Sequence, residues 1–319
     1  CMPMTSRLPQ PRIQQILSTG LPLIYVGLLT WLLIGPLWAE PGLPNSADGA
    51  LHLHRSAAMA RAWSAGVLWP RWLPAVYQGL GSPVYHYYSP LFYLLVAPLH
   101  LASLNLDLSA KLIITLLFMG SGLAIWAWLR RLLTSAAGLA GAALYLSQPH
   151  IFRELYFQGD YPQLLAVLLL PVVFWAFTRL YQEGNWLSWL VAPLSLATLV
   201  IMHNIMVMLG AGLLVLYWLA LHLWHRQGRG LLRGVAAAAF AAGLTAFFWL
   251  PALADADLVS IGNLQRGFFH FAQYFVPWQD LLAAPPVFDS RAGNPPFPHL
   301  LGWAAWLVVA AGILVLVSS

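Results

Sequence analysis

Three ionisable residues follow the first long apolar block at helical spacing. Asp48, His52 and Arg55 stand at positions i, i+4 and i+7, which puts them on one face of a helix. A carboxylate there can act as a general base or a metal ligand, and the neighbouring histidine can orient or share a proton. The alternative is structural, because Asp is a favoured N-cap and interfacial helices carry charges on their wet face. Both interpretations stay open from these residues alone.

A second polar cluster occupies residues 148–163. Asp160 with Pro162 in the following turn is a good helix start, so N-capping again competes with a catalytic role. Arg153 is a candidate ligand for a phosphate group, and its alternative is a simple ion pair with Glu154.

Polar residues also stand inside or beside two later apolar blocks. His203–Asn204 interrupts one block, where a polar pair is either functional or closes a turn through an interhelical hydrogen bond. Asp255 and Asp257 follow the Pro251 stop, either as oxygen ligands for a cation or as ordinary solvated residues. Both pairs therefore have a functional and a structural interpretation.

Residues 69–90 are dense in Trp, Tyr, Pro and Gly. Aromatic rings near arginines suit a sugar ring or a phosphate headgroup, through stacking and charge-assisted hydrogen bonds. The same residue types also collect at membrane interfaces without any ligand. The candidate ligand-binding side chains of this loop are Arg71, Trp72, Tyr85, His86 and Tyr88.

Composition sets the class of protein in which these residues must be placed. Sixty per cent of the residues are hydrophobic, 8% are charged, and there are 16 Trp and 23 Pro, a composition typical of multi-pass helical membrane proteins. The net charge of +5 comes from small basic groups between apolar blocks, which argues against a nucleic-acid partner. The single cysteine, Cys1, excludes an internal disulfide.

The apolar blocks predict an all-α bundle with about eight spans. The predicted spans are 21–39, 112–129, 136–147, 161–181, 186–203, 205–224, 234–253 and 299–317. The shorter block 91–104 is either a ninth span or a re-entrant or surface helix. The second choice puts the basic groups at 130–131 and 225–233 inside, as the positive-inside rule prefers. We therefore expect a re-entrant or surface helix.

This topology predicts one transmembrane domain, 1–319, in a cell membrane with a cytoplasmic N-terminus. The inner N-terminal tail is 1–18, and the outer loops are 40–108, 148–160 and 254–298, so the unusual polar residues converge on the outer face. The 186–224 block is too long for one helix across a bilayer, so it must turn near His203–Asn204.

An ordered series of short motifs resembles a known family. After Asp48 and His52 come LWPRW, GLGSPVYHYYSPLFYLL, GDYPQLLAVLLLP, MHN and FFWLPAL. Over residues 20–260 the series is similar to the polytopic membrane proteins related to 6-pyruvoyl-tetrahydropterin synthase, of GT-C type. It is more distantly similar to oligosaccharyltransferases and protein mannosyltransferases. The chain departs from the family pattern at Gln158-Gly159 and Gln163, and it lacks the large C-terminal region of many relatives, so a fragment or a reduced, inactive member is a further interpretation.

The resemblance implies a transferase that takes a sugar from a polyprenyl-phosphate donor on the outer leaflet. By motif position, Asp48 would be the catalytic acid/base of the first loop and Asp160 a second acidic group. We expect inverting transfer, with His52 beside the base and the lipid phosphate against Arg55, Arg71 or Arg153. A divalent ion on acidic residues is the alternative source of positive charge, and no metal ligand is assigned. His203 and Asn204 complete the predicted substrate site.

Two other classes of protein stay open. A non-catalytic subunit of a larger membrane complex, built on a degenerate scaffold, would co-purify with stoichiometric partners. A lipid or small-molecule transporter would explain a helix broken at His203–Asn204, but the sequence contains no clear internal repeat. Pigment or haem binding by His100, His203 or His222 is a weaker alternative, because no haem-attachment motif is present.

Overall fold

Helices make up the regular structure of this protein. The computed structural model describes residues 12–260, 262–263, 266–267, 270–284 and 299–318. Within these ranges there is no β-strand, and the one isolated bridge joins Leu73 to Ser82. The predicted all-helical fold is confirmed. The predicted inner tail lies mostly outside the described residues, and so does part of the predicted loop 254–298.

Fewer helices are long enough to cross a membrane than the eight predicted spans. Four described helices have the required length and hydropathy: α1 (Arg12–Ala39, apolar from Gly20), α5 (Leu106–Leu132), α8 (Tyr161–Gln182) and α10 (Asn204–His225). A pair bent by 68°, α11 (Gly228–Leu244) with α12 (Ala246–Ala254), counts as a fifth if it forms one span. Among the other predicted spans, the helices are α6 (Ser135–Leu146), α9 (Trp186–Met202) and α14 (Trp303–Ser318).

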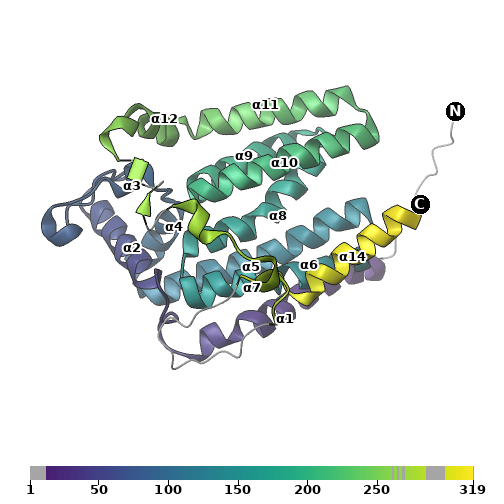
Figure 1. Ribbon diagram of the computed structural model, residues 1–319, viewed down its shortest axis with the longest axis horizontal. Coiled ribbons are helices and arrows are strands. Elements are labelled where there is room, and N and C mark those ends of the chain that lie inside the picture. The colour runs from purple at the N-terminus through teal and green to yellow at the C-terminus, as the bar shows by residue number, and fades with distance from the viewer. Residues whose placement is uncertain (1–11, 261, 264–265, 268–269, 285–298, 319) are drawn as a thin grey trace.

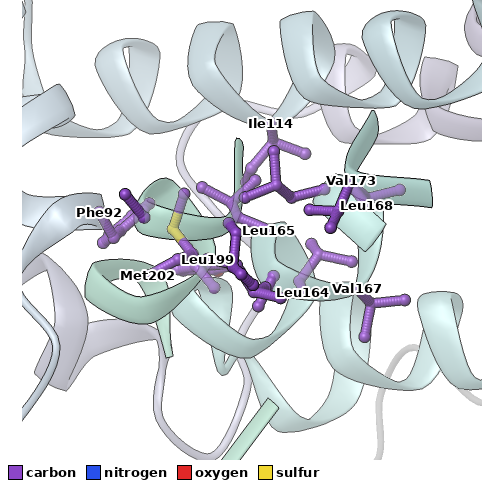
Figure 2. Close-up of a cluster of buried hydrophobic side chains, with 14 of the residues drawn as sticks. Phe92, Ile114, Leu164, Leu165, Val167, Leu168, Val173, Leu199 and Met202 are labelled. Atoms are coloured by element: carbon purple, nitrogen blue, oxygen red, sulfur yellow. The ribbon is translucent and has the colours of Figure 1, made fainter. Parts of the chain in front are cut away.

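Helix α8 is the centre of the bundle. In its most apolar 18-residue window, 72% of the residues are buried, and it packs against α5, α9, α10 and α11. Leu164, Leu165 and Leu168 of α8 lie in one cluster with Ile114 of α5 and Leu199 of α9 (Figure 2). A helix that is apolar all round is stable only where other helices or lipid cover it, so this one occupies the core.

A single non-helical residue separates α9 from α10. His203 has extended backbone angles (φ −160°, ψ 123°), and its ring nitrogen Nδ1 accepts a hydrogen bond from the Met206 amide at 3.2 Å. The imidazole thus caps the first turn of α10, a position that otherwise favours Ser, Thr, Asp or Asn. The predicted break at His203–Asn204 is confirmed.

The block 91–104 forms a short helix, α4 (Leu91–Leu101), that packs against α2 (Gly49–Ser64), α5, α8 and α9. Eleven residues span about 16 Å, roughly half of the hydrocarbon thickness of a bilayer. Phe92, Tyr93, Val96 and Ala97 are fully buried within the protein. The preference for a segment that does not cross the membrane is supported by this length.

The basic segments between helices lie together at one end of the bundle. Arg131 after α5 contacts Glu183 after α8 at 2.7 Å, and Arg179 contacts the same carboxylate at 2.8 Å. Arg233 of α11 donates to the carbonyl oxygen of Tyr181 at 3.4 Å. These contacts bring segments 130–135, 182–185 and 225–233 together, as predicted; which side of a membrane this end faces stays a prediction.

The other end carries the polar segments. In Figure 1, α2, α3 (Val84–Tyr87) and α12 gather at the left, away from the two chain ends. Between α6 and α8 the chain forms a short helix, α7 (Pro149–Phe152), and a π-helical turn, η2 (Arg153–Gln158). Single π-helical turns occur frequently at functional sites.

Candidate functional site

Three segments far apart in the sequence meet at the carboxylate of Asp160. Its Oδ1 lies 3.5 Å from Nε2 of His52 in α2, and its Oδ2 lies 3.6 Å from Nε2 of His203 at the α9–α10 break. Oδ1 also accepts a hydrogen bond from the Gln163 amide at 3.1 Å. Asp160 therefore caps α8, as its structural interpretation predicts, and it also joins two histidines, while its catalytic role stays a prediction. We call Asp160, His52 and His203 the Asp160 cluster.

Hydrogen bonds fix the orientation of both imidazoles. The guanidinium of Arg55 donates to the Tyr93 hydroxyl at 3.3 Å, and this hydroxyl lies 2.8 Å from His52 Nδ1. Nε2 of His52 faces the carboxylate of Asp160, which favours a proton on that nitrogen, so Nδ1 is left to accept from the Tyr93 hydroxyl. The capping bond accepted by Nδ1 of His203 orients that ring in the same way. Two ring N–H groups thus point toward one carboxylate.

Burial and charge act on the ionisation of this cluster. Burial lowers the pKa of His52 to about 4, helped by the positive charge of Arg55 and opposed by Asp160 and Asp48. Burial alone would raise the pKa of Asp160, but its contacts with His203 and His52 hold that pKa below the ordinary value. At neutral pH the cluster therefore holds a neutral His52 beside an ionised Asp160.

Asp48 stands beside this cluster but does not cap α2 with its side chain. Its Oδ2 accepts a hydrogen bond from Gln158 Nε2 at 2.6 Å, and its backbone amide donates to the Gln158 carbonyl at 2.7 Å. Among the described residues, Asp48 Oδ1 has no hydrogen-bond partner. The capping alternative is therefore wrong for Asp48, whose carboxylate is held at one oxygen and open at the other.

Glycine 159 permits the close approach of η2 to α2. It has a left-handed backbone conformation (φ +69°), and a Cβ at this position would lie 2.8 Å from the amide nitrogen of Gly49. Neither the conformation nor the space suits a larger residue. Gly159 thus places Gln158 against Asp48.

The predicted wet face of α2 is in fact the inner face. His52 is 1% exposed and Ser56 is fully buried, whereas His54 is exposed. Arg55 is half-buried and lies over the ring of Tyr88, with its guanidinium carbon 4.9 Å from the ring centroid. The structural interpretation based on a solvated charged face is therefore wrong for His52.

Two predicted tyrosines line the cluster. Tyr85 is buried and donates to the Arg55 carbonyl at 2.6 Å, while the ring of Tyr88 lies 6.3 Å from His52 and 6.2 Å from His203, between ring centroids. Burial raises the pKa of both phenols, so they stay protonated. Tyr85 holds the backbone of α2, and Tyr88 fills the space between the two histidines.

Arg153 lies against Glu154, as one of its two interpretations predicts. Arg153 Nη1 donates to Glu154 Oε1 at 2.6 Å, and His150 Nδ1 lies 3.7 Å from the same oxygen. Glu154 is fully buried, and burial raises its pKa to about 7 against the opposing charge of Arg153. The Arg153 side chain is thus engaged within the protein.

Arg71 and His86 do not contact the Asp160 cluster. Arg71 donates to His86 Nδ1 at 3.1 Å and to the Phe247 carbonyl at 3.0 Å, and His86 Nε2 lies 2.8 Å from Asp255 Oδ2. The two side chains therefore join the aromatic loop to α12. Trp72, 54% exposed, lies close against Gly81 at the far side of this loop.

The Asn204 side chain bonds to another segment, and it is His203 that caps the turn. The Asn204 amide nitrogen donates to the Tyr87 carbonyl at 2.7 Å, and its side-chain oxygen accepts from Ser89. These bonds tie the start of α10 to the segment that carries Tyr88. Asn204 thus positions the aromatic loop beside His203.

Two residues of the site gave no clear signal in the sequence. Tyr93 stands in an apolar run, where only the need of a buried hydroxyl for a partner could have indicated its contact with His52. Gln158 departs from the family pattern, yet among the described residues it makes the one side-chain bond to Asp48. In the described part of the chain, no group of three or more His, Cys, Asp or Glu residues could hold a metal ion.

Comparison with known proteins places this chain among membrane proteins. Residues 85–317 match the model of a family described as a 6-pyruvoyl-tetrahydropterin synthase related domain, membrane protein. The chain belongs to this family. The matched region includes Asp160 and His203, whereas Asp48 and His52 lie before it.

A curated relative is similar over most of the chain. It is an uncharacterized protein of Lactococcus lactis subsp. cremoris (strain MG1363), 23% identical over 269 residues. The alignment covers 80% of this chain but 43% of the relative's length. The chain thus spans less than half of that protein.

Proposed function

We propose that this chain is the membrane portion of a glycosyltransferase that uses a polyprenyl-phosphate sugar. The observation that carries the proposal is the convergence of Asp48 and the Asp160 cluster at one end of the bundle. The start of α2, the turn before α8 and the α9–α10 break supply these carboxylates and histidines. In the proposal, this end faces the outer leaflet of a cell membrane, the N-terminus is cytoplasmic, and eight spans form a GT-C-type bundle.

A groove beside α2 supports a lipid donor. It has a volume of about 440 Å³ and is apolar apart from Arg61, and it runs between α2 and residues 67–75. Exposed apolar side chains, including Leu68, surround the loop. An apolar groove next to a cation suits a hydrocarbon chain that carries a phosphate.

The open oxygen of Asp48 suits it to the role of general base. The acceptor hydroxyl attacks the anomeric carbon, a new C–O bond forms, and the bond from that carbon to the phosphate oxygen breaks. The hydroxyl proton passes to Asp48, and the polyprenyl phosphate leaves as an anion. Gln158 holds the other oxygen of Asp48, and the negative charge of the Asp160 cluster stabilises the positive charge that develops on the sugar.

Release of polyprenyl phosphate tests this function. The protein in lipid nanodiscs is given polyprenyl-phosphate-linked glucose, mannose or galactose with a panel of hydroxyl acceptors. We expect release from at least one donor, and a loss of about 100-fold or more in Asp48→Asn, because a positioned base contributes about 10²–10⁴ in rate.

The matched control is Asp257→Asn, since Asp257 is exposed in the turn Ala256–Leu258. This variant should retain the wild-type rate. Full activity in Asp48→Asn would remove the catalytic assignment, and no release from any donor would reject the transferase. Equal melting temperatures of both variants would exclude misfolding as the cause.

The runner-up is a non-catalytic subunit of a larger membrane complex. The observation in its favour is that Arg153, a predicted phosphate ligand, is engaged by Glu154 within the protein. It predicts no release of polyprenyl phosphate, together with stoichiometric co-purification of another membrane protein.

A further inference from the structure

A second histidine–carboxylate group joins the aromatic loop to α12. We call Arg71, His86 and Asp255 the Asp255 cluster. Arg71 donates to His86 Nδ1 at 3.1 Å, and because a guanidinium has no acceptor, this ring nitrogen must accept. The proton of the imidazole is then on Nε2, which lies 2.8 Å from Asp255 Oδ2. The three groups form a chain from guanidinium through imidazole to carboxylate.

The Arg71 guanidinium and the His86 imidazole are groups that commonly bind phosphate. Arginine and imidazole N–H groups make charge-assisted hydrogen bonds to phosphate oxygens, and the planar guanidinium matches them in geometry. In this structure the oxygen facing His86 belongs to Asp255. Although Nε2 and Oδ2 are at ion-pair distance, Nε2 makes no aligned hydrogen bond with any partner. The carboxylate neutralises the donors without satisfying them fully.

Exposure separates the donors from the carboxylate. The side chain of His86 is 12% exposed, whereas that of Asp255 is 45% exposed. An arriving anion therefore meets Asp255 at the surface and can displace it while His86 stays in place. Partly exposed ion pairs are weak, so the displacement costs little.

The position of Asp255 on α12 permits this displacement. Helix α12 follows the 68° bend at Thr245, and Phe248 is its one buried residue. Its other links to the loop are the bond from Arg71 to the Phe247 carbonyl at 3.0 Å, the bond from Tyr87 to the Asp255 carbonyl at 2.8 Å and the edge contact of Trp69 with Phe247. A helix with so few buried contacts can shift without unfolding the bundle.

We propose that Arg71 and His86 form a phosphate-binding subsite that Asp255 occupies as an internal competitor. The ligand is a phosphate monoester or diester, and the identification of it as a lipid phosphate rests on the proposed function. Binding exchanges one anion for another: Asp255 leaves the His86 N–H, and a phosphate oxygen accepts from His86, while Arg71 on the other ring nitrogen orients the imidazole and supplies positive charge. No covalent bond changes.

Equilibrium binding to the full chain in detergent tests the subsite. The probe is a radiolabelled polyprenyl phosphate without sugar, and the variants are Asp255→Asn and its matched control Asp257→Asn. We expect Asp255→Asn to bind about two- to fivefold tighter than wild type, the range set by the loss of one partly exposed ion pair. Asp257→Asn should bind as wild type does.

A double variant gives the result that would overturn the proposal. Adding Arg71→Gln to Asp255→Asn should abolish the gain in affinity, because it removes the positive charge beside His86 and the guanidinium that orients its ring. If Asp255→Asn binds no tighter than wild type, or if the gain survives Arg71→Gln, the subsite does not exist.

Competition separates the two sources of phosphate. Displacement of the probe by inorganic phosphate supports a subsite that recognises the phosphate group alone. Displacement by unlabelled polyprenyl phosphate but not by inorganic phosphate supports a lipid ligand. Displacement by neither, or equally by polyprenol without phosphate, would overturn the proposal. Sugar transfer plays no part in this assay, so its outcome is independent of the outcome of the polyprenyl-phosphate release assay.

Discussion

The Asp160 cluster and the Asp255 cluster use the same chemistry at different depths. Each pairs a carboxylate with histidine near the segment 84–89, but His52 is 1% exposed and the Asp255 side chain is 45% exposed. Electrostatic interactions strengthen as water is excluded, so the buried cluster contributes to the fold and the exposed cluster can open. Depth, rather than residue type, separates a fixed site from one that can exchange its anion.

Removal of Asp160 is the strongest test of this contrast. Asp160→Ala deprives two buried imidazoles of their partner and α8 of its N-cap. A buried donor left without a partner costs about 1–3 kcal/mol and the loss of an N-cap about 1 kcal/mol, so we expect a loss of about 3 kcal/mol. The free energy of unfolding in mixed detergent micelles measures it.

Asp107→Ala is the matched control for this measurement, because Asp107 lies in the first turn of α5 but does not cap it. It should cost less than 1 kcal/mol, within the range of an exposed helix-dipole contact, which is about 0.3–1 kcal/mol. Equal losses in the two variants would show that the Asp160 cluster contributes nothing beyond helix-end electrostatics.

Acid should weaken the protein through His52. In the unfolded chain this imidazole takes up a proton near pH 6.5, whereas in the folded protein its pKa is about 4. At His52 the unfolded state therefore binds more protons between these values, and the contribution of this residue to stability falls as the pH drops from 7 to 5. The contribution of this residue is about 2 kcal/mol, at about 1.4 kcal/mol per pH unit. We expect the melting temperature of His52→Gln to rise relative to that of wild type as the pH drops over this range.

Glu154→Gln provides the opposite control. The pKa of Glu154 is raised from 4.5 to about 7, so the folded state binds more protons and this residue contributes stability as the pH falls. The melting temperature of Glu154→Gln should therefore fall relative to that of wild type as the pH drops from 7 to 5. Parallel pH profiles in wild type and both variants would contradict the ionisation states assigned here.

The helices and their breaks could be predicted from the sequence because hydropathy and length determine them. The turn at His203 is one case, since residues 186–224 exceed the length of a single crossing. The number of spans was harder to predict, because a short helix such as α6 is as apolar as a span. Composition alone does not show that such a helix is too short to cross a membrane.

The contacts of the site were predictable only in part. Asp48, His52 and Asp160 stand out as polar residues in an apolar chain, but their partners Gln158 and Tyr93 do so much less. Spacing along a helix indicates which residues share a face, yet it does not indicate which face is buried. For α2 the inner face carries His52, because tertiary partners satisfy its ring nitrogens.

Gly159 tests whether close packing of η2 on α2 supports the buried cluster. Gly159→Ala places a Cβ 2.8 Å from the Gly49 amide in a left-handed conformation, which we expect to cost about 1–2 kcal/mol. Gly66→Ala is the control, because Gly66 has a similar positive φ (+82°) with open space around it. A similar loss of melting temperature in both variants would leave backbone strain as the whole effect.

The smallest effect is expected in the exposed cluster. Asp255→Ala removes a carboxylate that is 45% exposed, and partly solvated ion pairs contribute about 0–1 kcal/mol, so the melting temperature should barely change. The bond from Tyr87 to the backbone carbonyl of Asp255 persists in this variant and keeps α12 attached. Asp160→Ala should reduce stability several times more. The ratio of the two losses of stability therefore measures how much burial strengthens a carboxylate–histidine contact. A loss for Asp255→Ala as large as that for Asp160→Ala would mean that this contact also holds the fold, and Asp255 could not then exchange readily with a phosphate.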